Sequence, residues 1–211
     1  MHRKIGRTAV AAIIATIASA AFASSANARL LTESATSCDD GLITQPFRQF
    51  GDSHNYKLLP GGSFEAGTAA WQLSGGAKIV SGNETYKVGG ASHSSSLSLP
   101  SGGAAISPFT CVGLGEPTLR LFAKRNSALL GLVSTLNVQI QVQTSLGLSI
   151  WLPVLPGDLG GSSWHQTAQM PLIANILPLS ASDKTPVRFR FSPLLGSWQI
   201  DDVYVDPFMK R

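Results

Sequence analysis

The stretch TLNVQIQVQT (135–144) decides the fold class of this chain. Its apolar residues recur at every second position from 136 to 142, and Asn or Gln occupies each position between them. Alternate side chains of a β-strand point to opposite faces of the sheet. We therefore predict a strand with one face in the core and the other face either solvated or lining a groove.

Further strands are predicted downstream of this one. LGLSIWLPV (146–154) follows after a short connection and is expected to form a hairpin with it. VRFRF (187–191) alternates again, and WQIDDVYV (198–205) follows a turn and is expected to pair with it. Many short strands separated by turns, with no long segment of helical period, predict an all-β sandwich or barrel.

Residues 1–28 have the layout of a secretory signal peptide. Three basic residues precede an apolar run, AVAAIIATIASAAFA (9–23), and small residues then lead to an A-x-A cleavage site ending at Ala28. A second such site ends at Ala23. An uncleaved membrane anchor is the alternative, although a span needs about 20 apolar residues. We predict cleavage after Ala28, a secreted or cell-envelope protein, and no membrane span after cleavage.

The composition of the mature chain limits the ligands and the number of domains that we expect. Cleavage leaves 183 of the 211 residues and removes three of the 16 Lys and Arg residues but none of the 12 Asp and Glu residues, so the net charge falls from +4 to +1. The remaining basic residues are scattered, whereas nucleic-acid binding needs a clustered basic surface. We expect a monomer that binds no nucleic acid, with an N-terminal arm at 29–59 and one β-sandwich domain at 60–211.

The chain has two cysteines, Cys38 and Cys111. An even pair in an exported chain is most simply a disulfide. The bond would tie the N-terminal arm to the body by closing a loop of about 70 residues, which is worth roughly 4 kcal/mol on the chain-entropy model. The alternative, a lone reactive thiol, needs a base or metal partner that the sequence does not indicate.

Two short motifs carry a family resemblance. GGSFEAGTAAW (61–71) and WQIDDVYV (198–205) together resemble the jelly-roll carbohydrate-binding modules, also called galactose-binding-like domains, and GGASHSSSLSL (89–99) is a looser version of a third motif. The resemblance implies a jelly-roll β-sandwich of two antiparallel sheets. It also implies a glycan or another cell-surface polymer as ligand.

Asp201 and Asp202 stand side by side in a predicted strand, where adjacent carboxylates are disfavoured. The step from Ile200 to Val203 changes the strand's parity and predicts a β-bulge at the pair. Because the first and last strands of a sandwich commonly lie near each other, we expect Glu65 beside the pair. Converging carboxylates repel one another unless a cation joins them.

The resemblance implies a structural Ca²⁺ ion at this place, with Glu65 and Asp202 as side-chain ligands and Asp201 beside them. In this interpretation Asp202 points inward, whereas Asp201 faces solvent or stabilises a turn. Glu84 lies several residues before the middle loop and is not assigned as a ligand. The alternative is that no ion binds and that Asp202 accepts hydrogen bonds from backbone N–H groups.

The four tryptophans divide into two pairs. Trp71 and Trp198 accompany the two motifs and are expected in the core. Trp151 and Trp164 are the candidates for ligand binding, because an exposed indole offers a flat apolar face to a sugar ring. The Asn and Gln residues of 135–144 would supply hydrogen bonds to hydroxyl groups, although a solvated sheet face explains the same residues and is the favoured interpretation.

No catalytic residues are predicted. The chain contains no HExxH, no CxxC and no G-x-S-x-G nucleophile elbow. Two adjacent aspartates point to opposite faces and do not flank one bond as the acids of a glycosidase do. The sequence therefore predicts a secreted, non-catalytic glycan-binding or cell-surface-binding module. The alternatives are a structural cell-envelope protein without a specific ligand and a small hydrolase.

Overall fold

The computed structural model describes residues 42–66, 71–113, 117–128, 133–143, 148–172 and 184–206. These residues form fourteen strands and one short 3₁₀-helix, η1 (Arg48–Phe50), with no α-helix among them. In these segments no helix is long and apolar enough to cross a membrane. The predicted signal peptide and the first part of the predicted arm lie outside the described residues.

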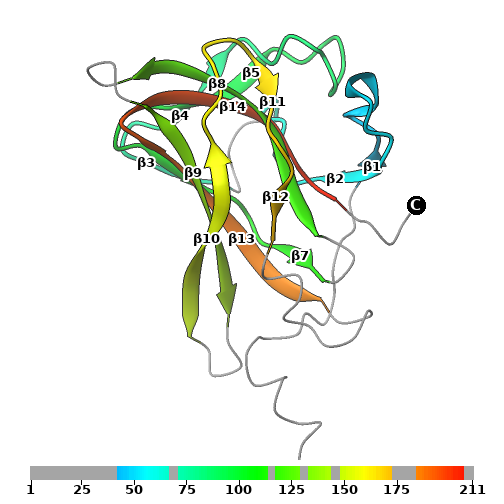
Figure 1. The fold of residues 1–211 in the computed structure, drawn as a ribbon, viewed down its shortest axis with the longest axis vertical. Coiled ribbons are helices and arrows are strands. Elements are labelled where there is room, and N and C mark those ends of the chain that lie inside the picture. The colour runs from blue at the N-terminus through cyan, green and yellow to red at the C-terminus, as the bar shows by residue number, and fades with distance from the viewer. Residues whose placement is uncertain are drawn as a thin grey trace, which may run out of the picture.

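Two antiparallel sheets make up the fold, as predicted (Figure 1). The first sheet contains eight strands: β1 (Ile43–Thr44), β2 (Tyr56–Leu58), β4 (Lys78–Ser81), β5 (Ser95–Leu99), β8 (Thr118–Ala128), β11 (His165–Gln166), β12 (Met170–Pro171) and β14 (Gly196–Val205). The second sheet contains six: β3 (Gln72–Ser74), β6 (Ala104–Ile106), β7 (Thr110–Val112), β9 (Thr135–Gln143), β10 (Ser149–Asp158) and β13 (Thr185–Leu194). The predicted jelly-roll β-sandwich is confirmed.

The alternating stretch that predicts the fold class becomes β9. Its apolar residues lie in the core, with Leu136 and Ile140 at most 1% exposed. β9 pairs with β10 in the predicted hairpin and with β13 on its other side. The outward residues of β9 are its Asn and Gln residues, so the outer face of the second sheet is polar.

The predicted pairing of 187–191 with 198–205 is wrong. β13 pairs with β6, β7 and β9 of the second sheet, whereas β14 pairs with β2, β5 and β8 of the first. The chain changes sheets at Leu195, which has a positive φ of 58°. Both strands bury apolar side chains on one face, and placing them in opposite sheets lets those faces meet across the core.

β14 lies in the middle of the first sheet. It pairs with β8 on one side, and on the other side with β5 at its beginning and with β2 at its end. The register with β8 shifts between Asp201 and Tyr204, and Asp202 has a φ of 47°. The predicted β-bulge is therefore present at the aspartate pair, and it re-aims the two carboxylates.

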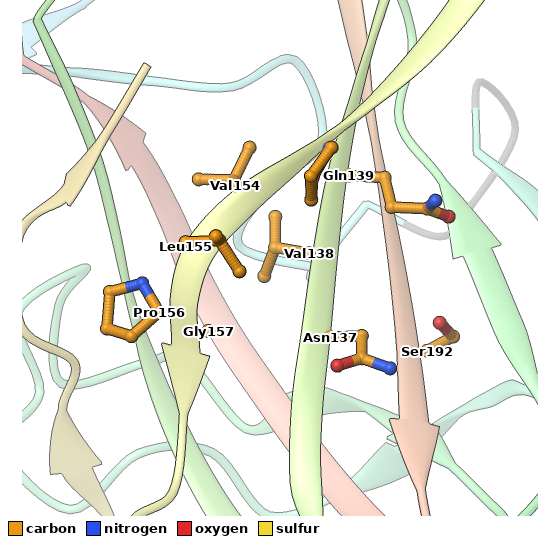
Figure 2. Close-up of a pocket in the computed structure, with 9 residues that line it drawn as sticks. Asn137, Val138, Gln139, Val154, Leu155, Pro156, Gly157 and Ser192 are labelled. Atoms are coloured by element: carbon orange, nitrogen blue, oxygen red, sulfur yellow. The ribbon is translucent and has the colours of Figure 1, made fainter. Parts of the chain in front are cut away.

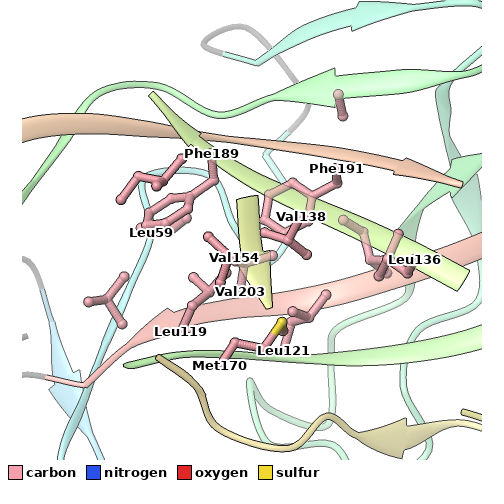
Figure 3. Packing of buried hydrophobic residues seen from close by; sticks show 14 of the residues in the cluster. Leu59, Leu119, Leu121, Leu136, Val138, Val154, Met170, Phe189, Phe191 and Val203 are labelled. Atoms are coloured by element: carbon pink, nitrogen blue, oxygen red, sulfur yellow. The ribbon is translucent and has the colours of Figure 1, made fainter. Parts of the chain in front are cut away.

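The main hydrophobic core fills the space between the sheets (Figure 3). Phe189 and Phe191 of β13 face Leu119 and Leu121 of β8 and Val203 of β14. The two tryptophans expected in the core, at positions 71 and 198, are 6% and 0% exposed.

A second, aromatic cluster lies on the other side of the first sheet. Phe122 follows the core residue Leu121 along β8, so its side chain points to the outer face of the first sheet. The segment around η1 covers it, with Phe47 stacked on Phe122 at 5.4 Å between ring centroids. The part of this face under η1 is therefore buried by the chain's own residues: Phe47, Tyr56, Phe122, Trp164 and Tyr204 form the cluster.

An ion pair anchors the described part of the predicted N-terminal arm to the body. Arg120 of β8 donates a hydrogen bond from Nη1 to Asp52 Oδ2 at 2.7 Å, and its guanidinium lies 4.1 Å from the Phe47 ring centroid. Tyr56 donates to the same oxygen at 2.6 Å. Cys111 in β7 has no free thiol. Its predicted partner, Cys38, lies outside the described residues, so the pairing stays a prediction.

Candidate functional site

The outer face of the second sheet presents a cross-strand row of polar and aromatic side chains. Trp151 of β10 and Arg188 of β13 stand directly opposite Gln141 of β9, on its two sides. Arg188 donates from Nε to Oε1 of Gln141. Its guanidinium lies 5.9 Å from the Trp151 ring centroid and 5.1 Å from that of Phe109, a ring that is 52% exposed. An aromatic surface therefore flanks a fixed cation.

A second row runs beside the first. Gln139 of β9 stands between Pro153 of β10 and Arg190 of β13, and Arg190 in turn stands opposite Ile106 of β6. The Nε–H of Arg190 is buried and has no hydrogen-bond partner. This row continues the polar surface across the sheet and leaves a strong donor unsatisfied.

A pocket of about 280 Å³ opens on the same face, next to these rows (Figure 2). Asn137 and Gln139 of β9 and Ser192 of β13 supply its polar lining. The register of β10 against β9 shifts between Val154 and Asp158, so the residues 155–157 bulge beside the pocket and form its wall. The pocket therefore combines apolar walls with convergent amide and hydroxyl groups, the composition typical of small-molecule sites.

Glycine is required in this wall at position 157. Its φ is +74°, and a side-chain Cβ there would come within 2.7 Å of the backbone oxygen of Leu136. Any other residue would push β10 away from β9. The shape of the pocket thus depends on a backbone conformation that the alternating pattern of 135–144 does not reveal.

The structure separates the two tryptophans predicted to bind ligand. Trp151 lies on the outer face of the second sheet, partly exposed. Trp164 is 9% exposed and belongs to the aromatic cluster on the first sheet. The Tyr86 hydroxyl donates to its backbone oxygen at 3.0 Å, and the Lys124 ammonium lies 5.1 Å from its ring centroid. Only Trp151 therefore presents its indole on an open sheet face.

A cluster of four carboxylates forms where β14 meets the loops of the first sheet. Asp201 and Asp202 are 1% and 0% exposed, and Glu84 is 0% exposed. Asp201 was expected either to face solvent or to stabilise a turn, and the first of these two alternatives is wrong. Its Oδ2 accepts a hydrogen bond from the Glu84 N–H at 3.0 Å, and its Oδ1 accepts one from the Asp202 N–H at 2.9 Å. Asp201 therefore holds the loop after β4 against β14.

The two glutamates of the cluster accept hydrogen bonds from loop backbones. Glu65 Oε1 accepts from the N–H groups of Ser94 and Ser95 at 2.8 and 2.7 Å. Glu84 Oε1 accepts from the Val88 N–H at 2.7 Å. By contrast, both carboxylate oxygens of Asp202 are buried without a hydrogen-bond partner. Asp202 is therefore the unsatisfied member of the cluster.

Burial and mutual repulsion govern the charge of the pair. Burial and, after it, the charge of Asp202 raise the pKa of Asp201 from 3.8 to about 9. Burial and the charges of Glu84 and Glu65 raise the pKa of Asp202 to about 7. The carboxylates of Glu65, Glu84, Asp201 and Asp202 thus interact as one group. We define these four residues as the carboxylate cluster.

The donor chemistry of the carboxylate cluster fits a hard cation. In the described residues, no three acidic, histidine or cysteine side chains are already arranged around one point to ligate an ion. The buried, unpartnered oxygens of Asp202 nevertheless need either a proton or a cation. Carboxylate oxygens with nearby loop carbonyls are the ligand type that Ca²⁺ takes. Glu65, Asp201 and Asp202 were the predicted residues; Glu84 was missed, because its burial depends on Asp201, which is remote in sequence.

Several solved carbohydrate-binding modules are similar to this chain. The C-terminal family 22 carbohydrate-binding module of a Clostridium thermocellum protein is 16% identical, with a TM-score of 0.41, over 69% of this chain and 91% of that one. A family 22 xylan-binding domain from Paenibacillus barcinonensis is 14% identical, with a TM-score of 0.43, over 69% and 90%. A family 61 module in complex with β-1,4-galactotriose is 13% identical, with a TM-score of 0.42, over 71% and 97%.

No protein-family model matches this chain, and no curated protein sequence does. The three structures named above are carbohydrate-binding modules, and a further similar structure is the enzymatically active domain of a bacteriophage tailspike protein. Identities this low transfer no ligand and no site residue to the present chain.

Proposed function

We propose that this chain is an exported, non-catalytic glycan-binding module and that its ligand lies across the outer face of the second sheet. The observation that carries the proposal is the row of Trp151, Gln141 and Arg188 beside the pocket. An indole ring offers an apolar surface to the face of a sugar ring, and amide groups bond its hydroxyls. The arrangement supplies both kinds of contact on one rigid sheet.

The two sheets differ in what covers them, which favours this face over the other. The aromatic cluster under η1 buries the part of the first sheet's outer side that Tyr56, Phe122 and Tyr204 form. On the second sheet, by contrast, the pocket opens between outward-facing residues of β9, β10 and β13. A polymer chain needs an open surface, and the second sheet offers one.

The placement of acidic residues supports a non-catalytic role. Hydrolysis of a glycoside requires two carboxyl groups about 5 to 9.5 Å apart, on either side of the bond. None of the seven acidic residues in the described segments is among the outward-facing residues that form the two rows and the pocket. The seven are Asp52, Glu65, Glu84, Asp158, Asp201, Asp202 and Asp206.

Trp151→Ala is expected to weaken glycan binding about tenfold or more, because the change removes the central aromatic surface of the face. The thermal midpoint should change little, since Trp151 lies outside both core clusters. The matched control is Ile150→Ala, its neighbour on β10 whose side chain points to the opposite side of the sheet. A glycan array followed by calorimetry on the strongest ligand measures both variants. Equal losses in the two variants would contradict the assignment of this face.

We also propose that the carboxylate cluster holds one structural Ca²⁺ ion. The unpartnered oxygens of Asp202 support this, together with the raised pKa values of the aspartate pair. Asp202 would be the central ligand, with Glu65, Glu84 and Asp201 around it. The ion would offset part of the negative charge of the cluster and so hold β14 to the loop between β4 and β5.

Chelation is expected to lower the thermal midpoint. An ion present at about 100 times its dissociation constant stabilises the folded state by about 2.7 kcal/mol. For a domain of this size, that corresponds to a shift of about 5–10 °C. Calorimetry after EDTA treatment, with and without added Ca²⁺, measures the shift, and Mg²⁺ serves as the comparison ion. An unchanged midpoint on chelation and on calcium addition would refute the metal site.

A further inference from the structure

We infer that the glycan carries carboxylate groups, as uronic acid residues do, and that Arg188 and Arg190 recognise them. This inference rests on the glycan-binding function proposed above. Both arginines project from β13 onto the outer face of the second sheet, where each stands opposite a glutamine of β9. The face that would contact the ligand is therefore cationic as well as aromatic.

Neither arginine has an acidic partner among the described residues. The ion pairs of these residues join Asp52 to His54 and Arg120, and Asp158 to His165, and none of them lies on this face. By contrast, Arg120 has a structural role: it is buried, forms an ion pair with Asp52 and stacks on Phe47. Arg188 also lies against aromatic rings, but neither arginine of β13 has an acidic partner among the described residues, and this leaves their charge for a ligand.

The hydrogen bonding of the two side chains supports the same conclusion. Arg188 uses its Nε–H on Gln141, which fixes the guanidinium plane between Trp151 and Phe109. The Nε–H of Arg190 is buried and makes no hydrogen bond. Because this atom is shielded from solvent, a ligand carboxylate would contact the terminal Nη groups of the two guanidiniums instead. The planar guanidinium fork also matches a carboxylate in two parallel hydrogen bonds.

The aromatic residues place the ligand next to these cations. A sugar ring stacked on Trp151 would lie beside a guanidinium whose central carbon is 5.9 Å from the indole centroid. Gln139 and Gln141 lie between the β10 side of the face and the arginines; Gln139, the more exposed of the two, would contact the ring hydroxyls, while the buried Gln141 holds Arg188. Aromatic, amide and guanidinium groups thus form successive strips from β10 to β13, an order that suits a sugar with an acidic substituent.

The test compares three probes by isothermal titration calorimetry with the full mature chain. The first probe is a set of uronic acid oligosaccharides, oligogalacturonate and oligomannuronate. The second is the same set with its carboxyl groups chemically reduced to alcohols, and the third is a sulfated galactan oligosaccharide. We expect binding of a carboxylated probe, loss of at least tenfold in affinity on carboxyl reduction, and weaker binding at higher salt concentration.

Two variants assign the effect to the arginines. Arg190→Gln and Arg188→Gln should each weaken binding of the carboxylated probe about tenfold to hundredfold, the range for a hydrogen-bonded ion pair. Arg188→Lys should recover only part of the loss, because an ammonium keeps the charge but not the fork. The control is Arg48→Gln, which removes the same charge from an exposed residue of η1 beside the first sheet.

The outcomes separate this inference from the proposed function. If the reduced and carboxylated probes bind equally well and Trp151→Ala abolishes both, the glycan-binding face stands and the carboxylate inference is wrong. Binding of the sulfated probe alone, or carboxylate binding that survives both arginine variants, also overturns the inference. If none of the three probes binds and a broad array of neutral glycans shows no binding either, the proposed function itself is wrong.

Discussion

Asp202→Asn is expected to stabilise the chelated protein and to destabilise the protein in calcium. Without an ion, Asp202 is a buried carboxylate that is repelled by Glu84 and Glu65, so neutralising it at pH 8 should increase the free energy of unfolding by about 2–4 kcal/mol. With Ca²⁺ bound, the same change removes a ligand and should cost a similar amount. Asparagine tolerates the φ of 47° at this position, so backbone strain does not enter.

Thermal unfolding in EDTA and in Ca²⁺ measures this reversal. The midpoint of the Asp202→Asn variant should rise by several degrees in EDTA and fall by several degrees in Ca²⁺. The control is Asp158→Asn, a buried aspartate outside the carboxylate cluster whose Oδ2 bonds the His165 ring at 2.8 Å. This control should lower the midpoint equally in both conditions. A variant at Asp202 that shifts the midpoint in the same direction with and without calcium would refute the calcium site and leave a purely structural carboxylate.

The chelated protein is also expected to lose stability as the pH rises from about 4 to about 9. The folded-state pKa values of Asp201 and Asp202, about 9 and about 7, exceed the unfolded value of 3.8. Between these values the folded state binds more protons than the unfolded chain, so stability falls with increasing pH, by about 1.4 kcal/mol per pH unit for each such proton. The loss is complete for Asp202 above about pH 7 and for Asp201 above about pH 9.

Urea unfolding at a series of pH values in EDTA measures how the free energy of unfolding depends on pH. Hydrogen bonding to Asp158 raises the pKa of His165, which contributes a loss of the same sign as the pH rises past its folded-state pKa. His165→Gln removes that contribution, and the remaining slope belongs to the cluster. Asp202→Asn should flatten the curve, and calcium should do the same by favouring the ionised carboxylates. A flat profile in EDTA at pH 5–8 would mean that the cluster is not desolvated.

Local patterns predicted much of this molecule correctly. The parity of 135–144 assigned its inward and outward residues, and the odd step from Ile200 to Val203 located the bulge. Both inferences depend only on the period of two of a strand, which neighbouring residues determine. Glu65 was expected beside the pair because the first and last strands would meet; it lies instead in the turn after β2, and its charge contributes to the raised pKa of Asp202.

The remaining features depend on contacts between distant residues. The turn at Leu195 looks like an ordinary hairpin connection, and only the packing of two apolar faces across the core decides that the strands join different sheets. Glu84 and Asp201 are buried because the backbone of one bonds the carboxylate of the other. Trp164 resembles Trp151 in the sequence, but an aromatic cluster assembled from four other segments encloses it. No local pattern carries that information.

The central position of β14 has a consequence for when the protein folds. The strands β2, β5 and β8 all pair with β14, and Val205 pairs with Lys57 across most of the described chain. During synthesis these earlier strands therefore have no central partner until residues 196–205 are available. Pairings over such separations form slowly, because a long loop must close first. The first sheet is therefore completed only after its C-terminal strand, β14, has been synthesised, whereas hairpins such as β9–β10 need no contact with β14.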